Sequence, residues 1–213
     1  MTERDLIPVF DGHNDVLLKL MSIGGAEPER MFPDGTPKGH LDLPRARQGG
    51  FAGGFFAVFP PPVGRPMDIS GPPPGAGENA GLPAELSRAD ASQSTIAMAS
   101  ILFRLERASE GALTVCRSAA DIRSAMERGS IAALFHIEGA EAIDPDLHML
   151  EVLHAAGLRS IGPVWSRRNI FGEGVPFRFP SSPDTGDGLS DAGKALVKAC
   201  NRLSILIDLS HLN

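Results

Sequence analysis

The chain has 213 residues, of which 42% are hydrophobic and 22% are charged, and its formal net charge at pH 7 is −6. This composition is ordinary for a globular protein, and the acidic balance argues against a nucleic-acid partner. Because no apolar segment approaches the ~20 residues needed to cross a bilayer, we also expect no membrane partner.

The predicted elements alternate between strands and helices from the N-terminus onward. Strands are expected over residues 6–10, 51–59, 112–116, 131–137, 159–164 and 204–209. Helices are expected over residues 14–23 and 88–109, from Ser118 to Gly129, from Asp144 to Gly157, and after Ser190. The two glycines Gly53-Gly54 predict a close backbone approach within their strand.

Several parts of the sequence are interpreted as loops or exposed surface. Residues 24–39 are expected to be a loop, and so are residues 165–189, which follow the strand over 159–164. Within the second loop, Arg167-Arg168 is expected to be ordinary surface charge. Residues 60–84 are rich in proline and glycine, which predicts a loop on the active face. Since a strand precedes and a helix follows this segment, we expect it to lie within one domain spanning residues 1–213.

The cysteines and the N-terminus bear on location. Cys116 and Cys200 lie far apart in apolar segments and are interpreted as reduced core residues. Residues 1–10 are charged and run directly into an apolar strand, which is unlike a secretory signal peptide. We therefore expect a cytoplasmic protein.

The order of elements predicts an α/β fold. Strands alternate with helices, and the later strands are almost continuously apolar, which is typical of parallel strands covered on both faces. An open doubly wound sheet and a (β/α)8 barrel both fit this pattern. No G-x-G-x-x-G motif or P-loop follows any strand of the sequence, which disfavours the first.

Potential metal ligands gather where three of the predicted strands end, and this is the active face of a parallel barrel. They are His13 and Asp15, then His136 and Glu138, then Asp208 and His211. Each residue alone would be unremarkable in a loop, but their joint placement favours a metal site.

The spacing and chemistry of these residues support that interpretation. His13 and Asp15 are two residues apart in an extended segment, so their side chains project to the same side, away from Asn14. Imidazole and carboxylate ligands suit zinc and its neighbours. Glu138 has two carboxylate oxygens and can bridge two ions, and two ions can share and activate one water.

The set of motifs, in this order, resembles the membrane dipeptidase (renal dipeptidase) family of zinc peptidases. The motifs are H-x-D at 13–15, "LDLPRARQGGFAGGFFAVF" at 41–59, "HIEGAEAID" at 136–144, "GLRSIG" at 157–162 and "GLSDAGKALVKACNRLSILIDLSH" at 188–211. The resemblance implies a (β/α)8 TIM barrel of the metal-dependent hydrolase type with two zinc ions. It also implies cleavage of the amide bond of a small dipeptide by a metal-bridging hydroxide.

The resemblance assigns roles to individual residues. His13 and Asp15 would be ligands of the first zinc, and Glu138 would be the bridging and catalytic carboxylate. His211 would be the first histidine of the second zinc. His136 stands where the family requires no ligand, so it is interpreted as a core histidine or one that lies behind the ligands.

Two departures from the family pattern stand out. Trp165 occupies the position where the family typically has a substrate-contacting histidine, and indole can donate one N–H but cannot carry a proton. We expect Trp165 to line the substrate pocket, with simple packing as the alternative.

The second departure is the end of the sequence, two residues after His211. The family continues with a second zinc histidine, a substrate-binding arginine and an aspartate near the bridging water. A (β/α)8 barrel usually needs about 250 residues. We therefore expect a barrel that is incomplete here, without its C-terminal strands and helices.

Two other functions stay open. One is an amidohydrolase that acts on a lactam or another non-peptide amide. The other is a non-catalytic barrel that retains part of the metal site and serves in binding or regulation. The oligomeric state is also open, with a homodimer as one candidate.

Overall fold

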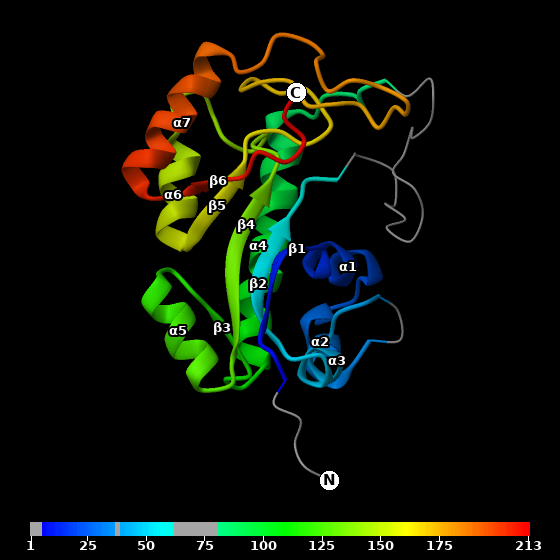
Figure 1. Ribbon diagram of the computed structural model, residues 1–213, viewed down its shortest axis with the longest axis vertical. Coiled ribbons are helices and arrows are strands. Elements are labelled where there is room, and N and C mark those ends of the chain that lie inside the picture. The colour runs from blue at the N-terminus through cyan, green and yellow to red at the C-terminus, as the bar shows by residue number, and fades with distance from the viewer. Residues whose placement is uncertain (1–5, 37–38, 62–80) are drawn as a thin grey trace. The chain divides into compact units, whose positions relative to one another are not determined.

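The computed structural model describes residues 6–36, 39–61 and 81–213 (Figure 1). Its strands are β1 (Val9–Asn14), β2 (Phe51–Val58), β3 (Leu113–Val115), β4 (Ile131–Glu138), β5 (Leu158–Gly162) and β6 (Leu206–Ile207). They form one sheet in the order β1-β2-β4-β5-β6, and β3 pairs with β4 outside this path. The pairs β1–β2, β3–β4 and β5–β6 are parallel. The predicted α/β class with parallel strands is therefore confirmed.

The chain divides into two compact units, and each is described by itself. The first comprises Met1–Ala57 and Met98–Phe135, and the second comprises Val58–Ala97 and His136–Asn213. The strand β4 and the helix α4 (Arg88–Ala108) each contribute residues to both units.

The first unit places short helices beside β1 and β2. They are α1 (Val16–Ile23), the 3-10 helix η1 (Pro28–Arg30), α2 (Met31–Asp34) and α3 (Leu43–Gln48), with α5 (Ala119–Glu127) following β3. A Cβ atom added to Gly53 would lie 2.5 Å from the Ala132 carbonyl oxygen, so β2 approaches β4 as closely as the glycine pair predicts. Ser118, where the sequence predicts the helix to start, caps α5 by accepting a hydrogen bond from the Asp121 N–H.

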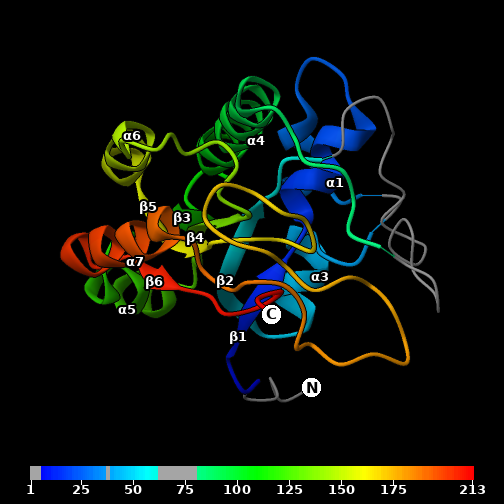
Figure 2. The same cartoon turned by 90° about the horizontal axis from the view of Figure 1, so that it is seen from above.

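The second unit packs helices against β5 and β6. The helix α6 (His148–Ala156) contacts β5, and α7 (Asp191–Leu203) contacts β6 (Figures 1 and 2). Ser190 caps α7 through the Gly193 N–H at 3.0 Å, and Gly157 ends α6 with a positive φ. Both ends agree with the sequence signals for helix boundaries.

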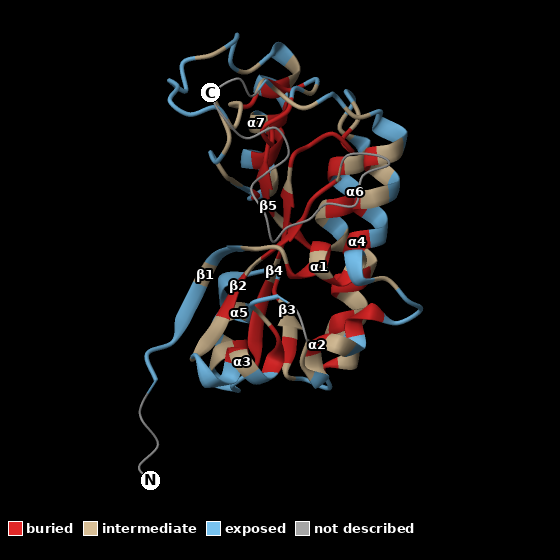
Figure 3. Cartoon of the chain, turned by 90° about the vertical axis from the view of Figure 1, so that its right-hand side faces the viewer, coloured by how far each residue is buried: buried red, intermediate tan, exposed pale blue. Residues whose placement is uncertain are grey.

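Burial differs sharply between strands. Figure 3 shows β5 as buried and β1 as largely exposed. Ile7, which precedes β1, is 83% exposed. Cys116 and Cys200 are both buried and free, and burial raises the pKa of each thiol to about 11. They are core residues, as the sequence predicts.

Several predicted boundaries are wrong. The first strand covers Val9–Asn14 instead of residues 6–10, because β1 is exposed and carries polar residues that the apolar pattern does not reveal. The stretch 24–39 was expected to be a loop but contains η1 and α2. The final strand is also shorter than expected.

The start of α6 differs as well. Leu147 adopts a left-handed conformation with φ 64°, so the helix begins at His148 and not beside Asp144. The Asp144 carboxylate still serves the helix, because it accepts hydrogen bonds from the His148 and Met149 N–H groups at 3.1 and 2.8 Å. The carboxylate therefore caps the helix from outside it, and the predicted start at Asp144 is too early.

The predicted loop over residues 60–84 lies mostly outside the described residues, since residues 62–80 are not described. Among the helices of the described ranges, none combines the length and apolar character that a membrane crossing requires.

Asp42 joins α3 to the segment before it. Its carboxylate caps α3 through the Arg45 N–H at 2.9 Å, accepts from Arg45 Nε at 2.8 Å and from the Thr36 N–H at 2.9 Å. The Arg45 side chain is the main reason that the pKa of Asp42 falls to about 2. Because the folded pKa is lower than the unfolded one, the stabilisation is full above about pH 4 and is lost as the pH falls toward about 2.

Asp42→Asn should therefore lower the free energy of unfolding by about 1 kcal/mol at pH 7, since asparagine keeps the cap but loses the charge. The difference from wild type should shrink between pH 4 and pH 2. Urea unfolding across this range measures it, with the exposed Asp34→Asn as the control. A difference that stays constant with pH would contradict the assignment.

Candidate metal centre

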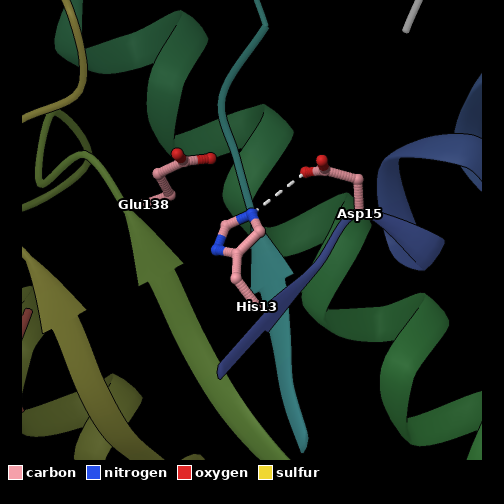
Figure 4. A group of neighbouring side chains, drawn as sticks. All are labelled: His13, Asp15 and Glu138. Carbon is pink, nitrogen blue, oxygen red and sulfur yellow. Dashed lines mark ion pairs between the residues drawn. The ribbon is translucent and has the colours of Figure 1, made fainter. Parts of the chain in front are cut away.

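His13 and Asp15 converge at the end of β1. Asn14 is the last residue of β1, and Asp15 is the N-cap residue of α1. His13 Nε2 lies 3.5 Å from Asp15 Oδ1, and the side chains are 36% and 44% exposed (Figure 4). Asn14 instead donates from Nδ2 to Asp11 Oδ2 at 3.3 Å. The i, i+2 spacing thus brings a histidine and a carboxylate together, as the sequence predicts.

Glu138 and His211 meet in the second unit. Glu138 is the last residue of β4, and its Oε1 lies 2.9 Å from His211 Nε2 (Figure 4 shows Glu138). Both side chains are mostly buried. The other ring nitrogen, His211 Nδ1, lies 2.9 Å from Ser166 Oγ. Two potential ligands from distant parts of the sequence therefore share one direct contact.

His136 is a buried histidine behind the strand end. Its Nδ1 lies 2.9 Å from Ser160 Oγ, and its Nε2 lies 3.8 Å from Asp208 Oδ2, which is too long for a hydrogen bond. This environment agrees with the interpretation of His136 as a core residue.

Trp165 lies in an aromatic cluster that touches His211. Its side chain is only 5% exposed. Its ring centroid lies 4.9 Å from that of Phe59, 5.3 Å from that of Phe177 and 6.1 Å from that of His211. Packing is thus one role that Trp165 has, and its neighbour His211 is one of the expected ligands.

Arg167 was expected to be surface charge, and this expectation is wrong. Arg167 is fully buried, and its Nε donates to Glu141 Oε1 at 2.8 Å while Nη2 donates to the Pro60 carbonyl oxygen at 3.1 Å. Its guanidinium also lies over the rings of Phe59 and Trp165, at 5.7 and 5.4 Å. Only a long-range partner explains such burial, and the local sequence does not reveal one.

The charge state of Glu141 depends on this arginine. Burial raises the pKa of Glu141, and the charge of Arg167 opposes that shift. The acid stands three residues after Glu138 in the same motif, and this was the one sequence signal that could have suggested a buried pair.

A second group of acids and a histidine lies at the start of α6. The ligand atoms of Asp144, Asp146 and His148 lie within 4.8 Å of one another. Hydrogen bonding to the Met149 N–H lowers the pKa of Asp144, because that carboxylate caps the helix. We therefore interpret this group as a helix cap.

The profile of the family described as membrane dipeptidase (peptidase family M19) matches residues 4–213. The chain belongs to this family. The resemblance seen in the sequence motifs is therefore confirmed.

Two solved structures share the fold closely. A metallo peptidase from Rhodobacter sphaeroides, liganded with a phosphinate mimic of the dipeptide L-Ala-D-Ala, is 50% identical with a TM-score of 0.89, over 98% of this chain and 60% of that one. The dipeptidase AC, a metallo peptidase of family M19, is 50% identical with a TM-score of 0.87, over 98% of this chain and 58% of that one.

A relative of undefined function also matches. An uncharacterized protein from Acinetobacter calcoaceticus is 37% identical over 207 residues, which are 97% of this chain and 64% of the relative. The chain thus spans less than two thirds of the length of each of these relatives.

The residues of this M19 chain suit divalent metal ions. The expected ligands are two imidazoles and two carboxylates, which is a donor set that zinc and similar ions accept. His211 Nε2 and Glu138 Oε1 also point at one another from 2.9 Å, so a small change of either side chain would admit a cation between them.

The adjacent arginines offer a matched pair of substitutions. Arg167→Ala should lower the free energy of unfolding by roughly 3–5 kcal/mol, because it leaves the buried Glu141 carboxylate without its partner. Arg168→Ala should change it by no more than about 0.5 kcal/mol, because Arg168 is exposed. Denaturant unfolding measures both, and equal effects would be incompatible with the buried pair. The double variant Glu141→Leu/Arg167→Met should recover much of the loss.

Proposed function

We propose that the complete protein is a zinc-dependent dipeptidase that hydrolyses the amide bond of small dipeptides. The observation that carries this proposal is the 50% identity to a metallo peptidase whose bound ligand mimics a dipeptide. The family match over residues 4–213 supports it further.

The proposed ligands are the four residues that the sequence motifs suggest. His13 and Asp15 would hold the first ion, Glu138 would serve both ions, and His211 would hold the second. In support, His13 Nε2 and Asp15 Oδ1 lie 3.5 Å apart in the first unit, and Glu138 Oε1 and His211 Nε2 lie 2.9 Å apart in the second. When bound, the two ions would activate a water and polarise the amide carbonyl.

The chain's own residues then have separate tasks. His13 and Asp15 offer their ligand atoms from the end of β1, at a contact of 3.5 Å. Glu138 contributes two carboxylate oxygens from the end of β4. Because it has two oxygens, its carboxylate can serve two cations at once. His211 offers one lone pair, and the rings of Trp165 and Phe177 lie beside its imidazole, with centroids at 6.1 and 6.0 Å.

We also propose that the complete fold is a (β/α)8 barrel. In support, β1 and β6 stand at the two ends of the strand order, and apolar side chains remain exposed at each. Ile7 before β1 is 83% exposed and Leu209 after β6 is 71% exposed. Further strands of a closed barrel would cover such edges.

A substrate panel tests the reaction. The full-length protein, loaded with zinc, is assayed on dipeptides that include L-Ala-D-Ala, on their N-acylated forms and on a lactam. We expect cleavage of the free dipeptides. Cleavage of only the lactam or the N-acylated forms would favour a different amidohydrolase, and no cleavage with no bound metal would favour a non-catalytic module.

Glu138→Gln tests the bridging role. An amide cannot neutralise two cations, so metal binding should weaken by at least about 100-fold, since even changes behind the ligands often cost about 10–100-fold. Zinc content and affinity are measured on the purified full-length variant. Glu151→Gln is the control, because Glu151 is exposed on α6. Wild-type zinc binding by Glu138→Gln would refute the assignment.

We propose that Trp165 borders the substrate through its contact with His211. Trp165→Ala should then raise KM for dipeptides with an apolar side chain, besides lowering stability by roughly 3–5 kcal/mol. Phe32→Ala removes another fully buried ring and should cost comparable stability without a change in KM. If Trp165→Ala, like Phe32→Ala, lowers stability and leaves KM unchanged, Trp165 is a packing residue only.

Trp165→His is the complementary change. Imidazole titrates near neutral pH, so a pocket position should give kcat a new pH dependence. An unchanged pH profile in the folded variant would place the side chain away from the reacting atoms.

A further inference from the structure

The ring of His211 makes a contact at each of its nitrogens. Nε2 lies 2.9 Å from Glu138 Oε1, and Nδ1 lies 2.9 Å from Ser166 Oγ. A neutral imidazole carries its proton on only one nitrogen, and the other nitrogen then has a lone pair. The partners of the ring therefore decide which nitrogen can bind a metal ion.

The two partners differ in what they can do. An ionised carboxylate only accepts hydrogen bonds, whereas a serine hydroxyl can donate or accept and rotates freely. Without metal, an Nε2–H can donate to Glu138 while Nδ1 accepts from Ser166. With Nε2 as a metal ligand, the proton must lie on Nδ1, and the same Ser166 oxygen can accept it. The hydroxyl thus serves both tautomers without moving.

Ser166 is held firmly enough to do this. Its side chain is buried, and it lies in a tight turn in which the Arg167 N–H donates to the Trp165 carbonyl oxygen at 2.6 Å. Arg167 is anchored by its 2.8 Å hydrogen bond to Glu141. Both residues that flank Ser166 are therefore fixed by buried contacts.

We propose that Ser166 is a positioning residue for metal binding: its hydroxyl holds the His211 ring so that Nε2 faces the ion, and it accepts the Nδ1 proton when Nε2 binds metal. This inference rests on the proposed function, because it assumes that His211 is a metal ligand. Hydrogen bonds of this kind orient ligand imidazoles and raise their basicity. No sequence motif pointed to Ser166, and its hydroxyl is 45 residues away from His211 along the chain.

The same unit contains a matched control. His136 Nδ1 lies 2.9 Å from Ser160 Oγ, which repeats the distance between His211 and Ser166. Both serines are buried, but His136 is not among the proposed ligands. Removing the Ser160 hydroxyl should therefore cost packing and hydrogen bonding alone, without an effect on the metal.

The experiment measures zinc affinity by chelator competition in the full-length protein. Ser166→Ala should weaken binding at one of two sites by about 10–100-fold. Ser166→Thr keeps the hydroxyl and should restore most of the affinity, and Ser160→Ala should bind zinc like wild type. Wild-type affinity in Ser166→Ala, or an equal loss in Ser160→Ala, would overturn the proposal.

A second measurement needs no variant. In the zinc-loaded wild-type protein, 15N NMR of the histidine side chains should show His211 with its proton on Nδ1. A proton on Nε2 would overturn the inference even if Ser166→Ala fails to fold.

The outcomes also separate this inference from the proposed function. A full-length wild type that binds no zinc would refute the proposed function, and the inference with it. A wild type that binds zinc, loses it in Glu138→Gln and keeps it in Ser166→Ala would refute the inference alone.

Discussion

The buried ion pair between Arg167 and Glu141 is the interaction on which the surroundings of His211 depend. Removing two charges from water is costly, so such a pair persists only when its geometry is good and its partners are in place. The 2.8 Å hydrogen bond meets that condition. Because Arg167 is fixed, the turn before it is fixed too. This turn carries Trp165, whose ring lies beside that of His211, and Ser166, whose hydroxyl contacts His211 Nδ1.

Much of the candidate centre could be predicted because it depends on local rules. The side chains of His13 and Asp15 converge through the two-residue period of an extended segment, and Glu138 stands at the end of an apolar strand. Parallel strands end on the same side, so the motif positions alone suggest a shared site. Ser166 and Glu141 were missed because their partners, His211 and Arg167, are 45 and 26 residues away along the chain.

The errors in the fold have a related origin. The sequence pattern predicts elements that bury one face, and it succeeded for β4 and α7, which are apolar on the inward side. It misplaced β1, where most side chains are exposed and polar residues occupy the strand. The start of α6 depends on the left-handed conformation of Leu147, and leucine gives no warning of such a conformation.

The backbone of His211 shows how side-chain chemistry can outweigh local preference. His211 has φ 66°, a left-handed conformation that glycine adopts at lower cost than residues with a Cβ atom. The Val175 N–H holds this conformation by donating to the His211 carbonyl oxygen at 2.9 Å. Two hydrogen bonds and two aromatic contacts then hold the ring. Glycine would suit the backbone here but would remove every one of those ring contacts. The left-handed backbone of His211 is therefore explained by the imidazole that this position presents to Glu138.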